Sequence, residues 1–215
     1  KQEKLPADKV LEGKLRLFKV HSKTIVWLKK AVMWHLQAQT IAAWTRTGFC
    51  AGFNMHGVEA DVMYEALKTQ NADGVFVSDF SGFETSARTQ TNDLMYTYME
   101  AKCVSPTLVV DLPNHPRFEV PMRAVWDFLR SYDAWHFALF PRAPMRAEPN
   151  SMSNVCLATG THPSGGFDTF WRNCWDNLTL HTWYAAVVSD IPARELRHCY
   201  ALYMCGDDNQ QASSV

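Results

Sequence analysis

The spacing of apolar residues along the chain predicts several helices and a few short strands. Apolar positions recur every three to four residues in five stretches, which are residues 23–44, 58–68, 88–102, 121–135 and 168–188. Short apolar or alternating runs predict strands over residues 14–20, 74–78 and 200–205. Glycines or prolines predict loops at 45–58, 112–121 and 141–153, and the residues after Asn209 form a polar tail. This mixture indicates an α+β fold.

Some side chains of the predicted helices have an expected place. We expect Asp168 to cap the last helix, because a carboxylate before the first turn accepts hydrogen bonds from free backbone amides. We also expect the tryptophans of the chain to pack in its core rather than to bind bases. One side of the first predicted helix carries Trp27, Ala31, Trp34 and Ala38.

Carboxylates follow two of the predicted strands. Asp79 comes directly after one apolar run, and Asp207 and Asp208 follow the last run across Gly206, which suits a tight turn. Neighbouring carboxylates repel each other and are costly unless a cation joins them. Mg²⁺, or Mn²⁺ in its place, suits a site whose ligands are all oxygen. The sequence therefore predicts a divalent-metal site formed by Asp79 and Asp207, with Asp208 as a supporting acid.

Charge is distributed unevenly along the 215 residues, a length that allows one large domain or two small ones. The first 30 residues contain nine Lys or Arg against three Asp or Glu, and the remainder contains twelve against nineteen. A basic N-terminal segment before an acidic remainder suits a protein that binds polyanions and metal ions. A solvated charged surface would give the same counts, and the acids downstream favour the first interpretation.

Cysteine spacing and hydropathy argue against several classes of protein. The six cysteines show no paired short spacing, which argues against a zinc site and a disulfide scaffold. We find no signal peptide and no apolar run long enough to span a bilayer. The chain starts without Met and is expected to be a piece of a longer protein. Asn177-Leu178-Thr179 fits the glycosylation pattern but lies inside a predicted helix, so we discount it.

A glycine-rich turn precedes the last predicted helix. It reads Ser164-Gly165-Gly166, and Thr169 and Asn173 follow it, four residues apart on one helix face. Backbone N–H groups at such a helix start favour anions. An ordinary glycine turn with a cap would show the same pattern, so the motif gains its meaning from its surroundings.

Taken together, these pieces resemble the RNA-dependent RNA polymerases of positive-strand RNA viruses. The resemblance covers nearly the whole chain, and the order and spacing of four short motifs carry it. Residues 1–16, with Lys14-Leu15-Arg16 at their end, are similar to motif F, Asp79-x4-Glu84 to motif A, Ser164-Gly165-x3-Thr169-x3-Asn173 to motif B and Gly206-Asp207-Asp208 to motif C.

The resemblance implies a right-hand polymerase palm, an antiparallel sheet with helices, together with parts of the fingers and without the thumb. It divides the chain into four segments. These are a fingers or fingertip region with motif F over residues 1–72, palm motif A over 73–101, a fingers return segment over 102–155, and palm motifs B and C over 156–215.

The resemblance also implies RNA-directed RNA polymerase activity, in which two divalent ions assist phosphoryl transfer from NTPs. The metal ligands would be Asp79, Asp207 and Asp208. The incoming nucleotide would be bound by Lys14 and Arg16 at its triphosphate and by Glu84, Ser164, Thr169 and Asn173 near its ribose. RNA template, product strand and NTPs are the implied partners, with other viral replication proteins in a complex in the host cytoplasm.

The chain departs from the family pattern in two places. Glu84 stands where motif A usually has Asp, and the stretch between motifs A and B, at residues 102–160, is longer than in picornavirus enzymes. A non-catalytic RNA-binding or scaffolding domain with a degenerate palm remains an alternative, which the intact acids disfavour. A reverse transcriptase is a weaker alternative, because Glu84 suits ribose binding. Such enzymes also usually show Tyr-x-Asp-Asp, whereas here Gly206 precedes the two acids.

Overall fold

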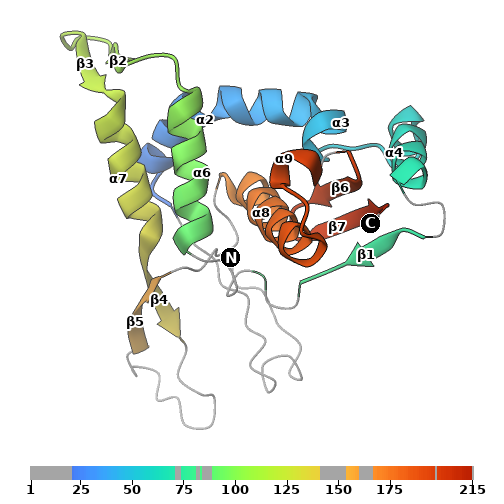
Figure 1. Ribbon diagram of the computed structural model, residues 1–215. Helices are drawn as coiled ribbons and strands as arrows, with labels where there is room; N and C mark the ends of the chain where they lie inside the picture. The colour runs from blue at the N-terminus through green and yellow to red at the C-terminus, as the bar shows by residue number, and fades with distance from the viewer. Residues whose placement is uncertain are drawn as a thin grey trace. The chain divides into compact units, whose positions relative to one another are not determined.

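The computed structural model describes residues 21–70, 74–80, 83, 89–140, 154–159, 167–196 and 198–214, with the backbone alone for 135–140 and 154–159. The chain forms two compact units. The first unit contains residues 1–18 and 84–163, and the second contains residues 19–83 and 164–215. Both mix helices with antiparallel strands, so the α+β prediction is confirmed (Figure 1). The division into fingers and palm segments stays a prediction.

A three-stranded antiparallel sheet forms the centre of the second unit. Its order is β1 (Phe76–Ser78), β7 (Asp208–Ser213) and β6 (Tyr200–Cys205), so the last strand in sequence lies in the middle. The pairs Phe76–Gln211 and Ser78–Asn209 set the register between β1 and β7. A two-residue turn, Gly206-Asp207, joins β6 to β7, and Gly206 has a φ of 75°. Glycine adopts this φ without strain, as type II′ hairpin turns require at their first position.

The second unit also contains helices, some of which cover the sheet (Figure 1). They are α2 (Lys23–Ala42), α3 (Trp44–Thr47), α4 (Val58–Gln70), α8 (Thr169–Ser189) and α9 (Ala193–Leu196). Helix α4 packs against β6 and β7, and α8 packs against β6 and α9. Met63 and Leu67 of α4 bury their side chains with Tyr203, Ala212 and Cys50. This cluster holds β6 and β7, the strands that flank the turn with Asp207.

The first unit is built on two packed helices, α6 (Thr89–Lys102) and α7 (Met122–Ala134). Tyr96 of α6 packs its ring on Trp126 of α7 and donates a hydrogen bond to Asp133. Two hairpins extend the helices, one of β2 (Thr107–Val110) with β3 (Phe118–Pro121) and one of β4 (Trp135–Phe140) with β5 (Asn154–Thr159). Among the residues described, no helix is both long and apolar enough to cross a bilayer.

The predicted helices are confirmed, with ends within a few residues of those expected. The loop predicted over 112–121 is wrong at its end, because Phe118–Pro121 pairs with β2 as a strand. The polar tail is also wrong, since the residues after Asn209 form most of β7 and bond to a strand on each side. The strand predicted over 14–20 and the loop predicted over 141–153 lie outside the described residues.

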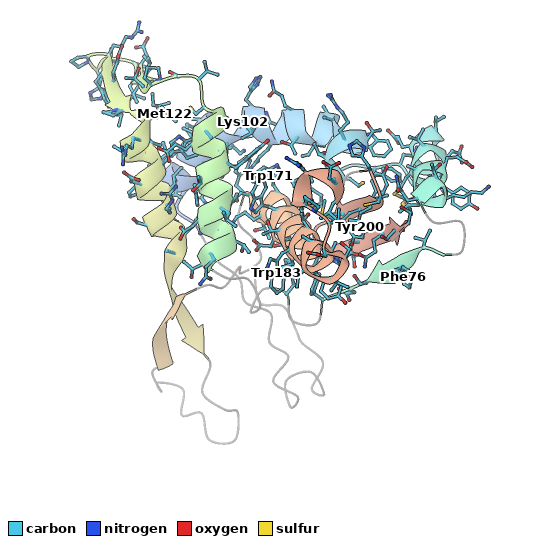
Figure 2. All side chains as sticks on the ribbon, viewed as in Figure 1. Phe76, Lys102, Met122, Trp171, Trp183 and Tyr200 are labelled. Carbon is cyan, nitrogen blue, oxygen red and sulfur yellow. The ribbon has the colours of Figure 1, made fainter. Side chains whose placement is uncertain are left out.

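The expectation that tryptophans fill the core holds for only some of them. Trp171 and Trp126 are buried, while Trp183 is largely exposed on α8, as is Phe76 on β1 (Figure 2). Trp27 of α2 is 74% exposed. Helix α2 instead buries a neighbouring stripe, which contains Ile25, Lys29, Met33 and Gln37. The helical period of this segment was predicted correctly, and the side that carries Trp27 is not the one that is buried.

Candidate active site

The sheet of the second unit places the three predicted acids at the same end of neighbouring strands. Ser78 and Asn209 form the last pair between β1 and β7. Asp79 follows Ser78 and Asp208 precedes Asn209, so the two acids lie at neighbouring strand ends. Asp207 belongs to the turn that directly precedes Asp208. Two segments more than 120 residues apart in the sequence therefore carry acids at neighbouring strand ends.

The charges of these acids act on one another. Asp208 is exposed, but the surrounding protein removes part of its hydration, which raises its pKa, and the negative charges of Asp207 and Asp79 raise it further. A divalent cation would offset the negative charge gathered here. Within the described ranges, no three His, Cys, Asp or Glu side chains are already arranged to hold one metal ion. The donor chemistry thus suits a hard cation, although the carboxylates do not converge on a single point.

Buried polar side chains support the acid-bearing turn from α8. Asn177 donates from Nδ2 to the backbone oxygens of Gly206, at 3.3 Å, and Asp207, at 3.0 Å. The sulfur of Cys174, one turn earlier, accepts from the Gly206 N–H at 3.2 Å. Burial raises the pKa of the Cys174 thiol to about 12, so this side chain stays neutral at physiological pH.

Sequence reasoning missed Asn177 as a site residue. Its pattern with Thr179 matches a glycosylation signal, but its side chain is fully buried in the fold, so discounting that signal was right. One signal could have found it, because Asn177 lies four residues after Asn173 and shares its helix face with Thr169. Helical spacing alone does not reveal that this face meets the acid-bearing turn.

Two of the predicted ribose-binding residues lie near the start of α8. Thr169 is its first residue and is half-buried, and Asn173 is one turn later. Asn173 is only 9% exposed, and its Oδ1 has no hydrogen-bond partner among the described residues. An unpaired buried acceptor is costly and is therefore available for a ligand hydroxyl. The other predicted nucleotide-binding residues, Lys14, Arg16, Glu84 and Ser164, lie outside the described residues.

The helix start that carries Thr169 is fixed by an ion pair rather than by a cap. Asp168 precedes α8, but its side chain makes no capping hydrogen bond, so the predicted contact is wrong. Its carboxylate instead accepts from Nζ of Lys29 and lies 3.7 Å from Nη1 of Arg172. Two cations attract the carboxylate more strongly than backbone amides do, which explains the difference.

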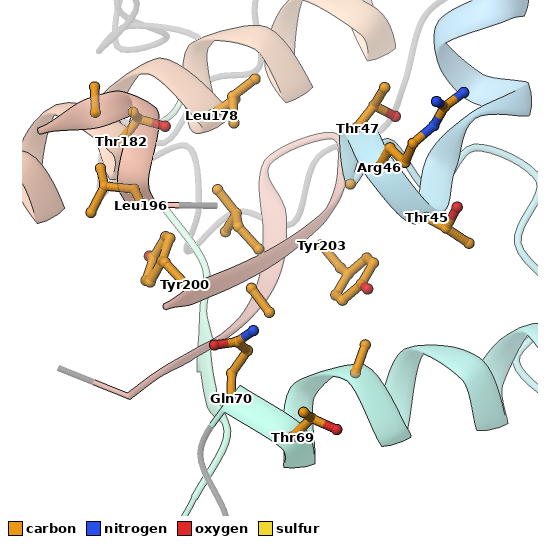
Figure 3. Close-up of a pocket in the computed structure, with 15 residues that line it drawn as sticks. Thr45, Arg46, Thr47, Thr69, Gln70, Leu178, Thr182, Leu196, Tyr200 and Tyr203 are labelled. Atoms are coloured by element: carbon orange, nitrogen blue, oxygen red, sulfur yellow. The ribbon is translucent and has the colours of Figure 1, made fainter. Parts of the chain in front are cut away.

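Cavities lie beside the sheet. One, of about 480 Å³, is lined by residues of α3, α4, α8, α9 and β6, including Arg46, Gln70 and Tyr200 (Figure 3). None of the three acids, all of which are described, lines it. A second cavity of about 390 Å³ is lined by Asp208 and by apolar side chains such as Phe53 and Val77. The second cavity thus adjoins Asp208.

A protein-family model supports one identity for this chain. The model described as viral RNA-dependent RNA polymerase matches residues 1–130. This range covers more than half of the chain and includes Asp79, whereas Asp207 and Asp208 lie beyond it. A comparison with curated proteins finds no match. The match over residues 1–130 shows that the chain belongs to the viral RNA-dependent RNA polymerase family.

Proposed function

We propose that the chain carries the catalytic core of an RNA-directed RNA polymerase, which copies viral RNA by nucleotidyl transfer from NTPs. The observation that carries this proposal is the register of the sheet, which sets Asp79 beside Asp208 and the adjoining Asp207 in a member of this family. RNA template, product strand and NTPs are the partners that the family implies. Assembly with other viral proteins in a replication complex of the host cytoplasm is part of the proposal.

The acids would hold divalent ions, Mg²⁺ or Mn²⁺. Such ions make the primer 3′-oxygen nucleophilic, neutralise the α-phosphate and stabilise the leaving pyrophosphate. Asp79 and Asp207 are the proposed ligands, one from each strand end, and Asp208 supports them from β7. Carboxylate oxygens are the donors that these ions prefer.

Other residues would bind the substrate. Lys14 and Arg16 are the proposed partners of the triphosphate, because a guanidinium can bind phosphate with two hydrogen bonds. Thr169 and Asn173 of α8, with Glu84 and Ser164, are proposed to bind the ribose. The unpaired Oδ1 of Asn173 supports this role, because it can accept from a sugar hydroxyl.

The test is Asp207→Asn in the full-length viral protein. The carboxamide keeps the shape of the side chain but loses the charge that holds a cation. Nucleotide incorporation should fall by roughly 10³-fold, because stabilisation by a metal ion is worth several kcal/mol. RNA binding should stay close to that of the wild type.

Asp61→Asn is a matched control, because Asp61 is an exposed acid in the first turn of α4. It should leave incorporation unchanged. Incorporation by Asp207→Asn near the wild-type rate would remove Asp207 from the catalytic centre. Metal-independent RNA binding without any incorporation by the wild type would favour the non-catalytic alternative.

A further inference from the structure

We propose that Asn177 is a positioning residue that sets the spacing of the three carboxylates and thereby the affinity of the site for divalent ions. This inference rests on the proposed function. The observation behind it is a continuous chain of hydrogen bonds that starts on α8, crosses β7 and ends on β1, with Asn177 at its head.

The first link joins the helix to the turn. The Asn177 amide donates both of its hydrogen bonds to backbone oxygens of the turn, those of Gly206 and Asp207. These bonds fix the two peptide groups that flank the Cα of Asp207. Cys174 holds the N–H of Gly206 from the same helix. The turn is therefore bound to α8 through its donor and its acceptors, rather than through apolar contact alone.

The next links join the turn to the neighbouring strand. Oδ1 of Asn177 accepts from Nδ2 of Asn209 at 3.2 Å. Oδ1 of Asn209 in turn accepts from Oγ of Ser78 at 2.9 Å. Asn177 and Asn209 are both buried, so water does not compete for the bond between them, while the Ser78 bond is partly buried.

Each of the three acids either is next in sequence to a residue of this hydrogen-bond chain or is itself one of its residues. Ser78 precedes Asp79, Asn209 follows Asp208, and the backbone of Asp207 is itself an acceptor. Strain or slack in the hydrogen-bond chain would therefore move all three carboxylates. Their mutual repulsion favours separation, so a bound turn is needed to keep them near one ion.

An amide is the side chain that this position requires. Asn177 uses two N–H donors and one acceptor at once. Aspartate at this position could accept from Asn209, but it would place a charge against two carbonyl oxygens. Leucine has the same branched shape, although it is larger, and would leave both carbonyls and the Asn209 amide without a partner. Both substitutions release the turn, and aspartate does so with almost no change in packing volume.

A purely structural role for Asn177 makes a different prediction from a positioning role. Loss of a structural hydrogen bond would lower the melting temperature and leave metal affinity unchanged in the folded fraction. Loss of a positioning bond would weaken metal binding at temperatures where the protein is fully folded. Outer groups that orient metal ligands typically change metal affinity by about 10- to 100-fold when removed.

The experiment measures Mn²⁺ binding to the full-length protein, without substrate, from the electron paramagnetic resonance signal of the free ion. The variants are Asn177→Leu, Asn177→Asp and Ser78→Ala, the last of which removes only the outer link and keeps the helix intact. Asn92→Leu is the matched control, because Asn92 is also a buried asparagine but lies on α6 in the first unit.

We expect Asn177→Leu and Asn177→Asp to weaken Mn²⁺ binding by about 10-fold or more, and Ser78→Ala to weaken it by a smaller factor. The Mg²⁺ concentration for half-maximal incorporation should rise in parallel, while the KM for NTP at saturating Mg²⁺ stays close to the wild-type value. Asn92→Leu should lower thermal stability without changing Mn²⁺ affinity. If the Asn177 variants do not fold, the shift in Ser78→Ala decides the outcome.

Two results would overturn the inference. Wild-type Mn²⁺ affinity in the folded variants, or a change no larger than in Asn92→Leu, would show that Asn177 has only a structural role. Failure of the wild type itself to bind Mn²⁺ or to incorporate nucleotides would overturn the proposed function, and this inference with it. The two failures are therefore distinguishable.

Discussion

Nζ of Lys29 lies 3.0 Å from both carboxylate oxygens of Asp168, and the two side chains are only 1% and 2% exposed. This ion pair joins α2 to the residue that precedes α8. It holds the start of the helix that carries Thr169, Asn173 and Asn177, and so contributes to the candidate active site from a distance.

Removing one partner of this pair should be strongly destabilising. We expect Lys29→Met to lower the free energy of unfolding by about 3 kcal/mol, because a buried carboxylate loses its closest cation while Arg172 remains. Urea unfolding of the folded protein measures this change. The control is Arg194→Ala, which breaks an exposed ion pair with Glu195 and should cost under about 1 kcal/mol. Equal effects of the two substitutions would contradict the importance of burial.

The acids should lower stability when no divalent ion is present. Asp208 stands beside the charges of Asp207 and Asp79, so Asp208→Asn should raise the melting temperature by about 1–3 °C in a metal-free buffer. Adding Mg²⁺ should raise the melting temperature of the wild type more than that of the variant. The measurement is thermal unfolding with and without Mg²⁺. A lower melting temperature of the variant under both conditions would show that the acids do not repel one another appreciably.

The stability of the second unit should decrease in mild acid because of His181. Burial lowers the pKa of His181, whose ring packs edge-on against Phe80, next to Asp79. The neutral ring contributes its full stability above about pH 6.5, the pKa of a histidine in the unfolded chain. This stability is lost as the pH falls toward and through the lower pKa of His181 in the folded protein. Thermal unfolding at pH 7.5 and 5.5 should therefore show a smaller drop for His181→Phe than for the wild type. His56→Gln, which changes an exposed histidine, should behave as the wild type does.

Sugar selection should depend on Asn173. Its buried Oδ1 lacks a partner, and a site that hydrogen-bonds a hydroxyl rejects the analogue without it. Asn173→Ala should narrow the ratio of kcat/KM for ATP over dATP by about tenfold, mainly through a loss of ATP efficiency. We expect Glu84→Asp, which restores the usual motif A residue, to retain ribose preference with partial activity. Unchanged ratios in both Asn173→Ala and Glu84→Ala would place sugar discrimination elsewhere.

Helices and the position of the acids could be predicted because local patterns encode them. Residues 58–68 show the helical period directly, and Asp79 and Gly206-Asp207-Asp208 each follow an apolar run that a strand requires. Local pattern also placed Asp168 correctly just before a helix. The local pattern could not reveal the ion-pair partner of Asp168, because Lys29 lies 139 residues away in sequence.

Polar residues account for most of what the sequence did not reveal. Strand β7 reads Asp-Asn-Gln-Gln-Ala-Ser, which has low strand propensity, and it forms because it bonds to β6 and β1 on both edges. The exposure of Trp27 has a related cause, since burial of the Lys29 pair turns a different face of α2 inward. Asn177 was missed because its partners belong to a turn about thirty residues later.

The location of bound Mn²⁺ tests the central claim most directly. Crystals of the full-length protein with primer–template RNA, a non-hydrolysable NTP and Mn²⁺ would show the ion by its anomalous scattering. We predict a peak that bridges Asp79 and Asp207, with ligand distances of roughly 2 Å and the two carboxylates about 4–7 Å apart. A manganese ion bound elsewhere, with the carboxylates of Asp79 and Asp207 too far apart to share it, would contradict the proposed active site.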